Sequence, residues 1–100
     1  MITLTLNGES SKAMELISFN RNTSFENGTM NSYAYMTIVP TATTAANLTA
    51  YGLNGITHLL IKDGNDPIYT LTNINANITS FDESLNGNEM TCSMNIRFNT

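Results

Sequence analysis

The segment KDGNDPIYTLTNINANITS, residues 62–80, holds the side chains whose types and spacing come nearest to a metal site. Asp63, Asn65 and Asp66 offer carboxylate and amide oxygens, which are the ligands that calcium prefers. A calcium loop between two helices also needs a bidentate glutamate about eleven residues after its first ligand, and Ile74 stands there. The sequence therefore favours a plain turn, with a calcium loop as the alternative.

Side chains typical of hydrolases and zinc enzymes are scarce. His58 is the only histidine, and no cysteine pair or second histidine can complete a zinc site with it. Asp82 and Glu83 are adjacent, so in a strand they point to opposite faces and cannot form the carboxylate pair of a glycosidase. We therefore expect no enzyme, no metal and no cofactor, and we interpret His58 as a half-buried strand residue bonded to a neighbour. The alternative, a small enzyme, requires a deep polar pocket around His58.

Four sequons, at Asn22, Asn27, Asn47 and Asn77, have the pattern of glycosylation acceptors. The chain contains 15 Asn, 15 Thr and 8 Ser, and this composition alone predicts about three to four sequons. The opening MITLTL also lacks the basic and long apolar segments of a secretory signal. We therefore attribute the sequons to composition and expect the chain to be cytosolic when it is made.

Only 12% of the residues are charged, about half the usual share, and the net charge is −4. Lys12, Arg21, Lys62 and Arg97 are scattered, so they form no basic stripe, and we expect no direct contact with nucleic acid. No apolar run approaches the ~20 residues of a membrane span, so we expect no membrane contact either. Uncharged polar groups must keep such a surface in solution.

Two-residue alternation predicts the strands that position these residues, and it is clearest in the last ten residues. The side chains of one parity are expected to face the core: Met90, Cys92, Met94, Ile96 and Phe98. Cys92 is therefore expected to be a small core residue. Further strands are predicted over residues 2–6, 13–20, 29–39 and 56–62. Because residues 29–39 are apolar on both sides, that strand is expected to be central or to lie against a neighbouring subunit.

Turn signals divide the remaining strands. Asp63 and Gly64 predict a hairpin, and so do Asn86 and Gly87. The inward parity changes near residues 72–73, which indicates a β-bulge or a crossing between two sheets.

An alanine-rich segment predicts one short helix, about residues 43–52. Thr43 or Thr44 is expected to accept hydrogen bonds from its first amides, and Gly52 to end it in the left-handed conformation. The sequence thus predicts a single, mainly β domain over residues 1–100. We expect an antiparallel β-sandwich or partly open barrel with this one helix.

The inserted helix, the Asn- and Thr-rich polar faces and the closing run ITSFDESLNGNEMTCSMNIRF make the whole chain similar to small virion proteins of tailed bacteriophages. In that group, β-sandwich domains with one helix build tail tubes, tail terminators, neck rings and capsid decorations as symmetric oligomers. The resemblance implies a structural virion component, either a capsid decoration, a neck or adaptor protein, or a tail protein. It also implies assembly in the host bacterial cytoplasm through contacts with copies of itself and with other virion proteins.

A candidate subunit interface follows from the strand pattern, because a tyrosine-bearing face or an unpaired strand edge readily adds a neighbour. Its residues are Tyr33, Tyr35, Thr91, Ser93, Asn95 and Arg97, the last four forming the polar edge of the final strand. The alternative is a small β-sandwich module that binds a carbohydrate or a protein ligand. Its stacking surfaces would be provided by Tyr33, Tyr35, Tyr51 or Tyr69.

Overall fold

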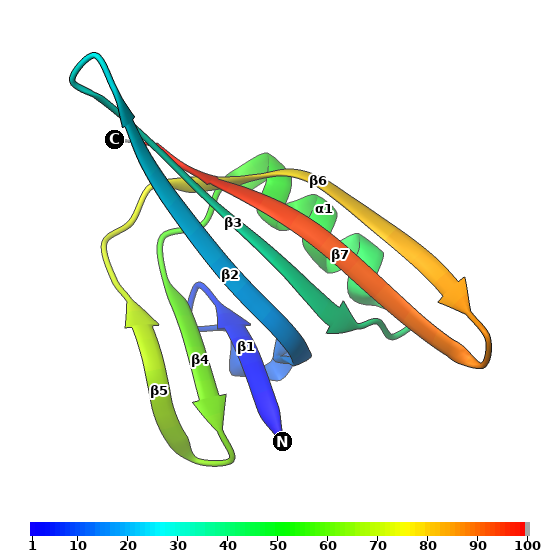
Figure 1. The fold of residues 1–100 in the computed structure, drawn as a ribbon. Helices are drawn as coiled ribbons and strands as arrows, with labels where there is room; N and C mark the ends of the chain where they lie inside the picture. Colours follow the sequence, from blue (N-terminus) through cyan, green and yellow to red (C-terminus); the bar gives the residue numbers. More distant parts are fainter. Residues whose placement is uncertain (100) are drawn as a thin grey trace.

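Seven strands and one α-helix make up most of residues 1–99, which are the residues that the computed structural model describes (Figure 1). The strands are β1 (Ile2–Leu6), β2 (Met14–Glu26), β3 (Thr29–Val39), β4 (Leu59–Asp63), β5 (Asp66–Leu71), β6 (Ala76–Asn86) and β7 (Glu89–Phe98). The helix is α1 (Thr44–Asn54), and a 3-10 turn, η1 (Ser10–Lys12), joins β1 to β2. All strand pairs are antiparallel, in the order β5-β4-β1-β2-β3-β7-β6.

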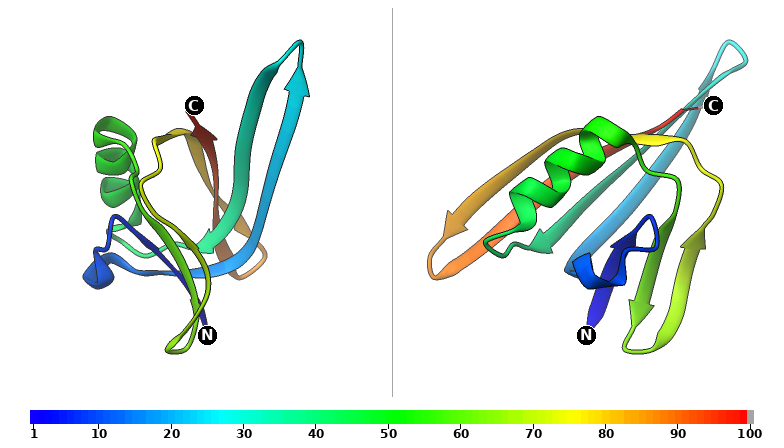
Figure 2. Two further views of the ribbon diagram at one scale, coloured as in Figure 1. Left: turned by 90° about the vertical axis from the view of Figure 1, so that its left-hand side faces the viewer. Right: turned by 180° about the vertical axis from the view of Figure 1, so that it is seen from behind.

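The sheet bends so far that its two ends approach each other (Figure 2). Ile56, just before β4, pairs with Ala76 at the start of the edge strand β6. The Ile56 amide donates to the Ala76 carbonyl at 2.7 Å, and the Ala76 amide donates back at 3.0 Å. This single bridge partly closes the sheet, so the prediction of a mainly β fold, sandwich-like or a partly open barrel with one helix, is confirmed.

The core lies on the inner face of the bent sheet, where α1 packs against β6. Leu48 and Tyr51 are the buried apolar side chains of α1. They join inward-facing side chains from the strands, chiefly Leu4, Leu6, Met36, Ile38, Leu59, Met94 and Ile96. Among residues 1–99, no helix has the length and apolar character that crossing a membrane requires.

The helix exists as predicted, but both of its ends differ from the prediction. Thr43 makes no side-chain capping hydrogen bond, and the Thr44 hydroxyl instead accepts from the amide of Thr41, which precedes the helix, at 2.8 Å. Gly52 is not the end of the helix. Gly55 ends it with φ at +88°, and its amide donates to the Tyr51 carbonyl at 2.8 Å. Its ψ is 168°, so Gly55 ends the helix in an extended, positive-φ conformation that glycine alone adopts readily, and not in the predicted left-handed helical conformation.

The predicted register of β7 is confirmed for four of its five inward residues, since Cys92, Met94, Ile96 and Phe98 are buried. Met90 is the exception, with 43% of its surface exposed. It has the inward parity, but it lies toward the end of the β6-β7 hairpin, which extends past α1 (Figure 1). Alternation shows on which face of β7 Met90 lies, but it does not show whether another element covers that face at this point. The prediction that Met90 is in the core was therefore wrong.

The prediction for β2 was too short. This strand continues to Glu26 and pairs with β3 along its whole length, with Glu26 opposite Thr29. Asn27 and Gly28 form the turn with φ of +51° and +79°, as a type I′ hairpin requires. Residues 20–31, which we call the arm, project from the rest of the molecule (Figure 2).

Three other sequence predictions have clear outcomes. β3 is central, between β2 and β7. The β4-β5 hairpin is present, with Gly64 at φ +60° in its turn and Asp63 opposite Asp66. The parity change near residues 72–73 was interpreted wrongly, because it marks neither a bulge nor a crossing between two sheets. These residues lie in the loop through which the chain passes from one edge strand, β5, to the other, β6, of a single sheet, with Asn73 at φ +54°. The sheet has a bulge further on, between Ile78 and Ser80.

Candidate subunit interface

The six residues predicted to form an interface lie on one face of the sheet. Residues of β3 and β7 that oppose each other share a face, and Tyr33 is opposite Arg97 while Tyr35 is opposite Asn95. The alternate residues of both strands are buried on the inner face. We call the opposite side the outer face and define it by the predicted residues Tyr33, Tyr35, Thr91, Ser93, Asn95 and Arg97. Their neighbours in the register, Asn20, Asn22, Ser80 and Asp82, extend it across β2 and β6.

Two half-exposed tyrosines stand at the centre of the outer face. Tyr33 is 47% exposed and Tyr35 is 50% exposed, and they are two residues apart on β3. Asn22 lies opposite Tyr33, and Asn20 lies opposite Tyr35. The face thus places aromatic rings between amide side chains that can both donate and accept hydrogen bonds.

One hydrogen bond within the sheet holds the side chain of Asn95 in place. Its amide nitrogen lies 3.2 Å from the Ser80 hydroxyl, to which it donates. The Thr79 hydroxyl donates to the backbone carbonyl of Asn95 at 3.3 Å, which fixes the backbone at the same residue. Arg97 is exposed and makes no ion pair with another residue of the range 1–99. The outer face therefore combines a fixed amide with a cation that a partner can pair.

The final strand does not provide an edge. β7 pairs with β3 on one side and with β6 on the other, so its backbone groups are used within the sheet. The edge strands are β5 and β6. The expectation of an unpaired edge at Thr91, Ser93, Asn95 and Arg97 was therefore wrong, and these residues can meet a neighbour only through their side chains.

Two of the four tyrosines named as stacking surfaces are not available on an open face. Tyr51 is buried in the core, and its hydroxyl lies 3.2 Å from a carboxylate oxygen of Glu9. Burial and the charge of Glu9 raise the pKa of Tyr51 to about 12. The ring of Tyr69 packs against Phe19 with 5.4 Å between the ring centroids. Of the four tyrosines, Tyr33 and Tyr35 are the ones that lie on the outer face.

The candidate catalytic residues are dispersed. His58 is exposed just before β4, where its Nδ1 lies 2.9 Å from the Thr57 hydroxyl, so the expectation of a half-buried strand histidine was wrong. Asp82 is opposite Ser93, and Glu83 is opposite Cys92. The two acids thus point to opposite faces of the sheet, as predicted.

Cys92 is completely buried, as its parity predicted. Burial raises the pKa of its thiol, and the nearby charge of Glu83 raises it further. Both effects oppose formation of the reactive thiolate.

The oxygen-rich turn contains two exposed carboxylates at the ends of a two-residue loop. Asp63 and Asp66 are paired across Gly64 and Asn65. Within residues 1–99, no three His, Cys, Asp or Glu side chains are grouped as a metal site. The observed geometry is that of the plain hairpin turn.

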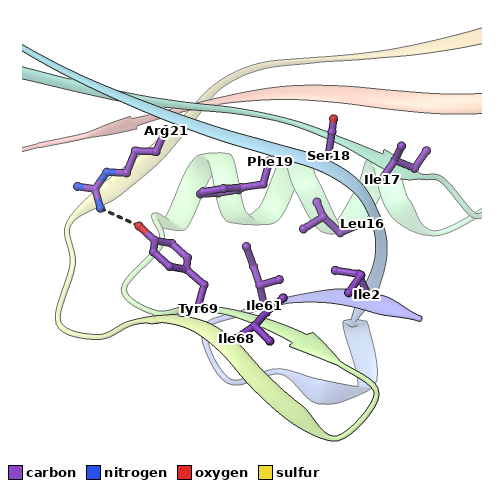
Figure 3. A pocket seen from close by; sticks show the side chains of 9 residues that line it. All are labelled: Ile2, Leu16, Ile17, Ser18, Phe19, Arg21, Ile61, Ile68 and Tyr69. Carbon is purple, nitrogen blue, oxygen red and sulfur yellow. Dashed lines mark hydrogen bonds between the residues drawn. The ribbon is translucent and has the colours of Figure 1, made fainter.

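One feature was not anticipated from the sequence, an apolar groove of about 480 Å³ between β2 and the β4-β5 hairpin. In Figure 3, Leu16 and Phe19 point from β2 toward the hairpin, whereas Ser18 points away. Its main apolar lining residues are Ile2, Leu16, Phe19, Ile61, Ile68 and Tyr69. Arg21 lies at one end and donates a hydrogen bond to the Tyr69 hydroxyl at 3.3 Å. Ile68 and Tyr69 are adjacent in the sequence, so on a strand they point to opposite sides and make both sides apolar. This pattern was the signal in the sequence that could have indicated the groove.

Comparisons with models of protein families, with curated proteins and with solved structures found no match to this chain.

Proposed function

We propose that this protein is a non-enzymatic structural component of a bacteriophage virion, acting through repeated subunit contacts. In this proposal it is a capsid decoration, a neck or adaptor protein, or a tail component, assembled in the host bacterial cytoplasm. Its partners are copies of itself and other virion proteins. The observation that supports the proposal best is the outer face, on which all six candidate interface residues lie together.

The chemistry of the outer face suits a permanent protein contact. Long charged side chains lose much conformational freedom and hydration when a contact buries them. Tyrosine provides a large contact area with little loss of freedom, and Asn, Ser and Thr can be buried once they are hydrogen-bonded. Arg97 and Asp82 are charged residues on this face, and they lie on neighbouring strands.

Mass spectrometry of particles purified from a host that makes the chain tests the proposal directly. The wild-type protein should be present at a fixed ratio to the other virion proteins. A double variant, Tyr33→Ala with Tyr35→Ala, should fold normally and be lost from the particles. Thr70→Ala, an exposed change on β5, is the matched control and should be retained. Absence of the wild-type chain from the particles would end the virion proposal.

A carbohydrate-binding module is the second candidate, and the spacing of the two tyrosines favours it. Sugar rings stack on aromatic faces and receive hydrogen bonds from neighbouring amides, which Asn20 and Asn22 would supply beside Tyr33 and Tyr35. A glycan that raises the melting temperature of the wild type, and not that of Tyr35→Ala, would support this function. If no glycan changes the melting temperature and the chain is present in particles, the carbohydrate-binding function is rejected and the virion proposal stands.

A further inference from the structure

We propose that the Asn-Gly steps at two hairpin tips, Asn27-Gly28 and Asn86-Gly87, are sites at which the chain modifies itself by losing ammonia. The product carries aspartate or isoaspartate where the asparagine stood. The sequence contains four Asn-Gly steps, and the fold protects the other two, at Asn7 and Asn54. The inference goes beyond the proposed function, because it concerns the isolated chain, whatever that chain assembles with.

The reaction needs only the groups of an Asn-Gly step, together with water. The backbone nitrogen of the glycine loses its proton to solvent base and attacks the side-chain carbonyl carbon of the asparagine. A carbon–nitrogen bond forms, the bond to the side-chain nitrogen breaks, and that nitrogen takes a proton from water and leaves as ammonia. Water then opens the five-membered imide at either carbonyl, which gives aspartate or isoaspartate. Glycine favours the attack because it has no Cβ to hinder it.

Both hairpin tips leave the reacting groups free. Asn27 and Asn86 are exposed, and neither side chain takes part in a hydrogen bond among residues 1–99. Over the same part of the chain, the Gly28 and Gly87 amides have no backbone acceptor. Even an added Cβ at either glycine would find no heavy atom within 4 Å. Solvent base and water therefore reach both steps.

Asn7 is held by its side chain, which is the group that must be attacked. Its amide nitrogen donates to the Gly55 carbonyl at 3.1 Å. Its amide oxygen accepts from the Thr57 amide at 2.8 Å, and from the Thr57 hydroxyl and the His58 amide at 3.3 Å each. These four hydrogen bonds fix the side chain against the segment before β4, so it cannot turn toward the Gly8 nitrogen.

Asn54 is protected at the attacking nitrogen instead. It is exposed at the last position of α1, but the Gly55 amide donates to the Tyr51 carbonyl at 2.8 Å. This hydrogen bond must break before the Gly55 nitrogen can lose its proton and attack. The two protected steps therefore lack different requirements of the same reaction.

The hairpin tips must open for the attack, and the fold makes opening easy. The type I′ turn holds ψ of Asn27 at about +30°, which directs the Gly28 nitrogen away from the Asn27 side chain. Residues 29–31 of β3 pair with β2 alone, because the register with β7 ends at Ser32. Residues 89–91 of β7 likewise pair with β6 alone. A two-stranded ribbon is marginally stable, so both tips open far more often than the core.

The reaction at Asn27 changes the arm in two ways. Either product adds a carboxylate beside Glu26, in a chain whose net charge is already −4. Isoaspartate also adds one carbon to the backbone of a two-residue turn, and the length of such a turn sets the register of its strands. With isoaspartate, the pairing of Glu26 with Thr29 is therefore expected to be lost, whereas Ser32 should stay paired with Phe98.

Incubation of the purified chain in mildly alkaline buffer made with heavy-oxygen water tests the selectivity. Trypsin then releases Asn7 and Asn86 on peptides of their own and Asn27 together with Asn54, and fragmentation mass spectrometry assigns the heavy oxygen to one residue. Asn27 and Asn86 should each react about tenfold faster or more than Asn7 and Asn54. In urea all four steps should react at similar rates, because only the fold distinguishes them. Reaction at either tip no faster than at the protected steps, or the same selectivity in urea, would overturn the proposal.

Two variants of the arm separate the chemistry from the turn. Gly28→Ala adds a Cβ beside the attacking nitrogen and strains a residue with φ at +79°. It loosens the turn, yet it should slow the reaction at Asn27 by about tenfold or more and leave Asn86 unchanged. Asn27→Asp carries one product from the start and should keep the hydrogen-exchange rate of the Thr29 amide, whereas the isoaspartate fraction, isolated by ion exchange, should exchange faster there. Undiminished reaction in Gly28→Ala, or unchanged exchange in the isoaspartate fraction, would overturn the mechanism.

Discussion

Arg21 stacks on Phe98, with the guanidinium carbon of Arg21 lying 4.0 Å from the centroid of the Phe98 ring. The same side chain donates to the Ser32 hydroxyl at 3.1 Å and to the Tyr69 hydroxyl at 3.3 Å. One arginine on β2 thus contacts β3, β5 and β7. Near the base of the arm, Arg21 therefore connects β5, through Tyr69, to β3 and β7, through Ser32 and Phe98.

Replacing this arginine should destabilise the fold. Arg21→Ala is expected to lower the free energy of unfolding by about 1–2 kcal/mol, because the cation–π contact, a part-buried hydrogen bond to Ser32 and an exposed one to Tyr69 are lost. Arg97→Ala, on the outer face, should change it by less than about 0.5 kcal/mol. Urea denaturation measures both. Equal effects of the two substitutions would contradict the linking role of Arg21.

Two phenylalanines provide a test of the core. Phe98 is 6% exposed, and Phe98→Ala should lower the free energy of unfolding by about 3–5 kcal/mol. Phe25→Ala removes the same side chain from the exposed arm and should change the stability of the monomer by less than about 0.5 kcal/mol. A large loss of monomer stability for Phe25→Ala would mean that the arm packs onto its own chain.

The buried tyrosine predicts a loss of stability at high pH. The pKa of Tyr51 is raised from 10.0 to about 12, first by burial and then by the charge of Glu9. Between pH 10 and 12 an unfolded tyrosine loses its proton while the folded one keeps it, so the free energy of unfolding should fall as pH rises. Below pH 10 this contribution is fully present. Tyr51→Phe should remove this part of the decline, and an unchanged pH profile in denaturant titrations would refute the assignment.

Two glycines near the end of α1 should respond oppositely to alanine. Gly52 is inside the helix, and an added Cβ would lie 3.9 Å from the Ile78 carbonyl oxygen, an ordinary contact. Gly52→Ala should therefore stabilise the protein by about 0.4–1 kcal/mol. Gly55 has φ at +88° and ψ at 168°, a region that L side chains rarely adopt, so Gly55→Ala should destabilise it by about 1–3 kcal/mol. Thermal unfolding of both variants measures the difference, and a shift of the same sign in both would contradict the observed helix end.

Sequence alternation was sufficient for the parts of the sheet whose two sides differ. It identified the inward side of β7 from Cys92 to Phe98, because a buried face requires apolar residues at every second position. It failed for residues 21–26, where both sides of the arm are exposed and no alternation is needed. The Asn27-Gly28 turn signal was present there, but it lay within a stretch of sequon-like composition.

The candidate face was predictable only in part. Parity correctly grouped Tyr33 with Tyr35, and Ser93 with Asn95, because each pair lies on one strand. Parity does not say which strands are neighbours, so the insertion of β7 between β3 and β6 was missed. The apolar groove was missed for the same reason, since it needs β2 beside a hairpin that begins more than thirty residues later.

The position of β1 also affects how the chain folds during its synthesis. β1 is made well before β4, which is one of its two neighbours, with Ile2 opposite Asp63. β3 likewise receives its second neighbour, β7, only when residues 89–98 have left the ribosome. Such non-local pairing is slow, so stopped-flow refolding should take milliseconds to seconds, and completion in microseconds would contradict this order. Until β4 and β7 are made, a nascent chain therefore displays two incomplete sheet edges, and chaperones that shield them would raise the yield of folded protein.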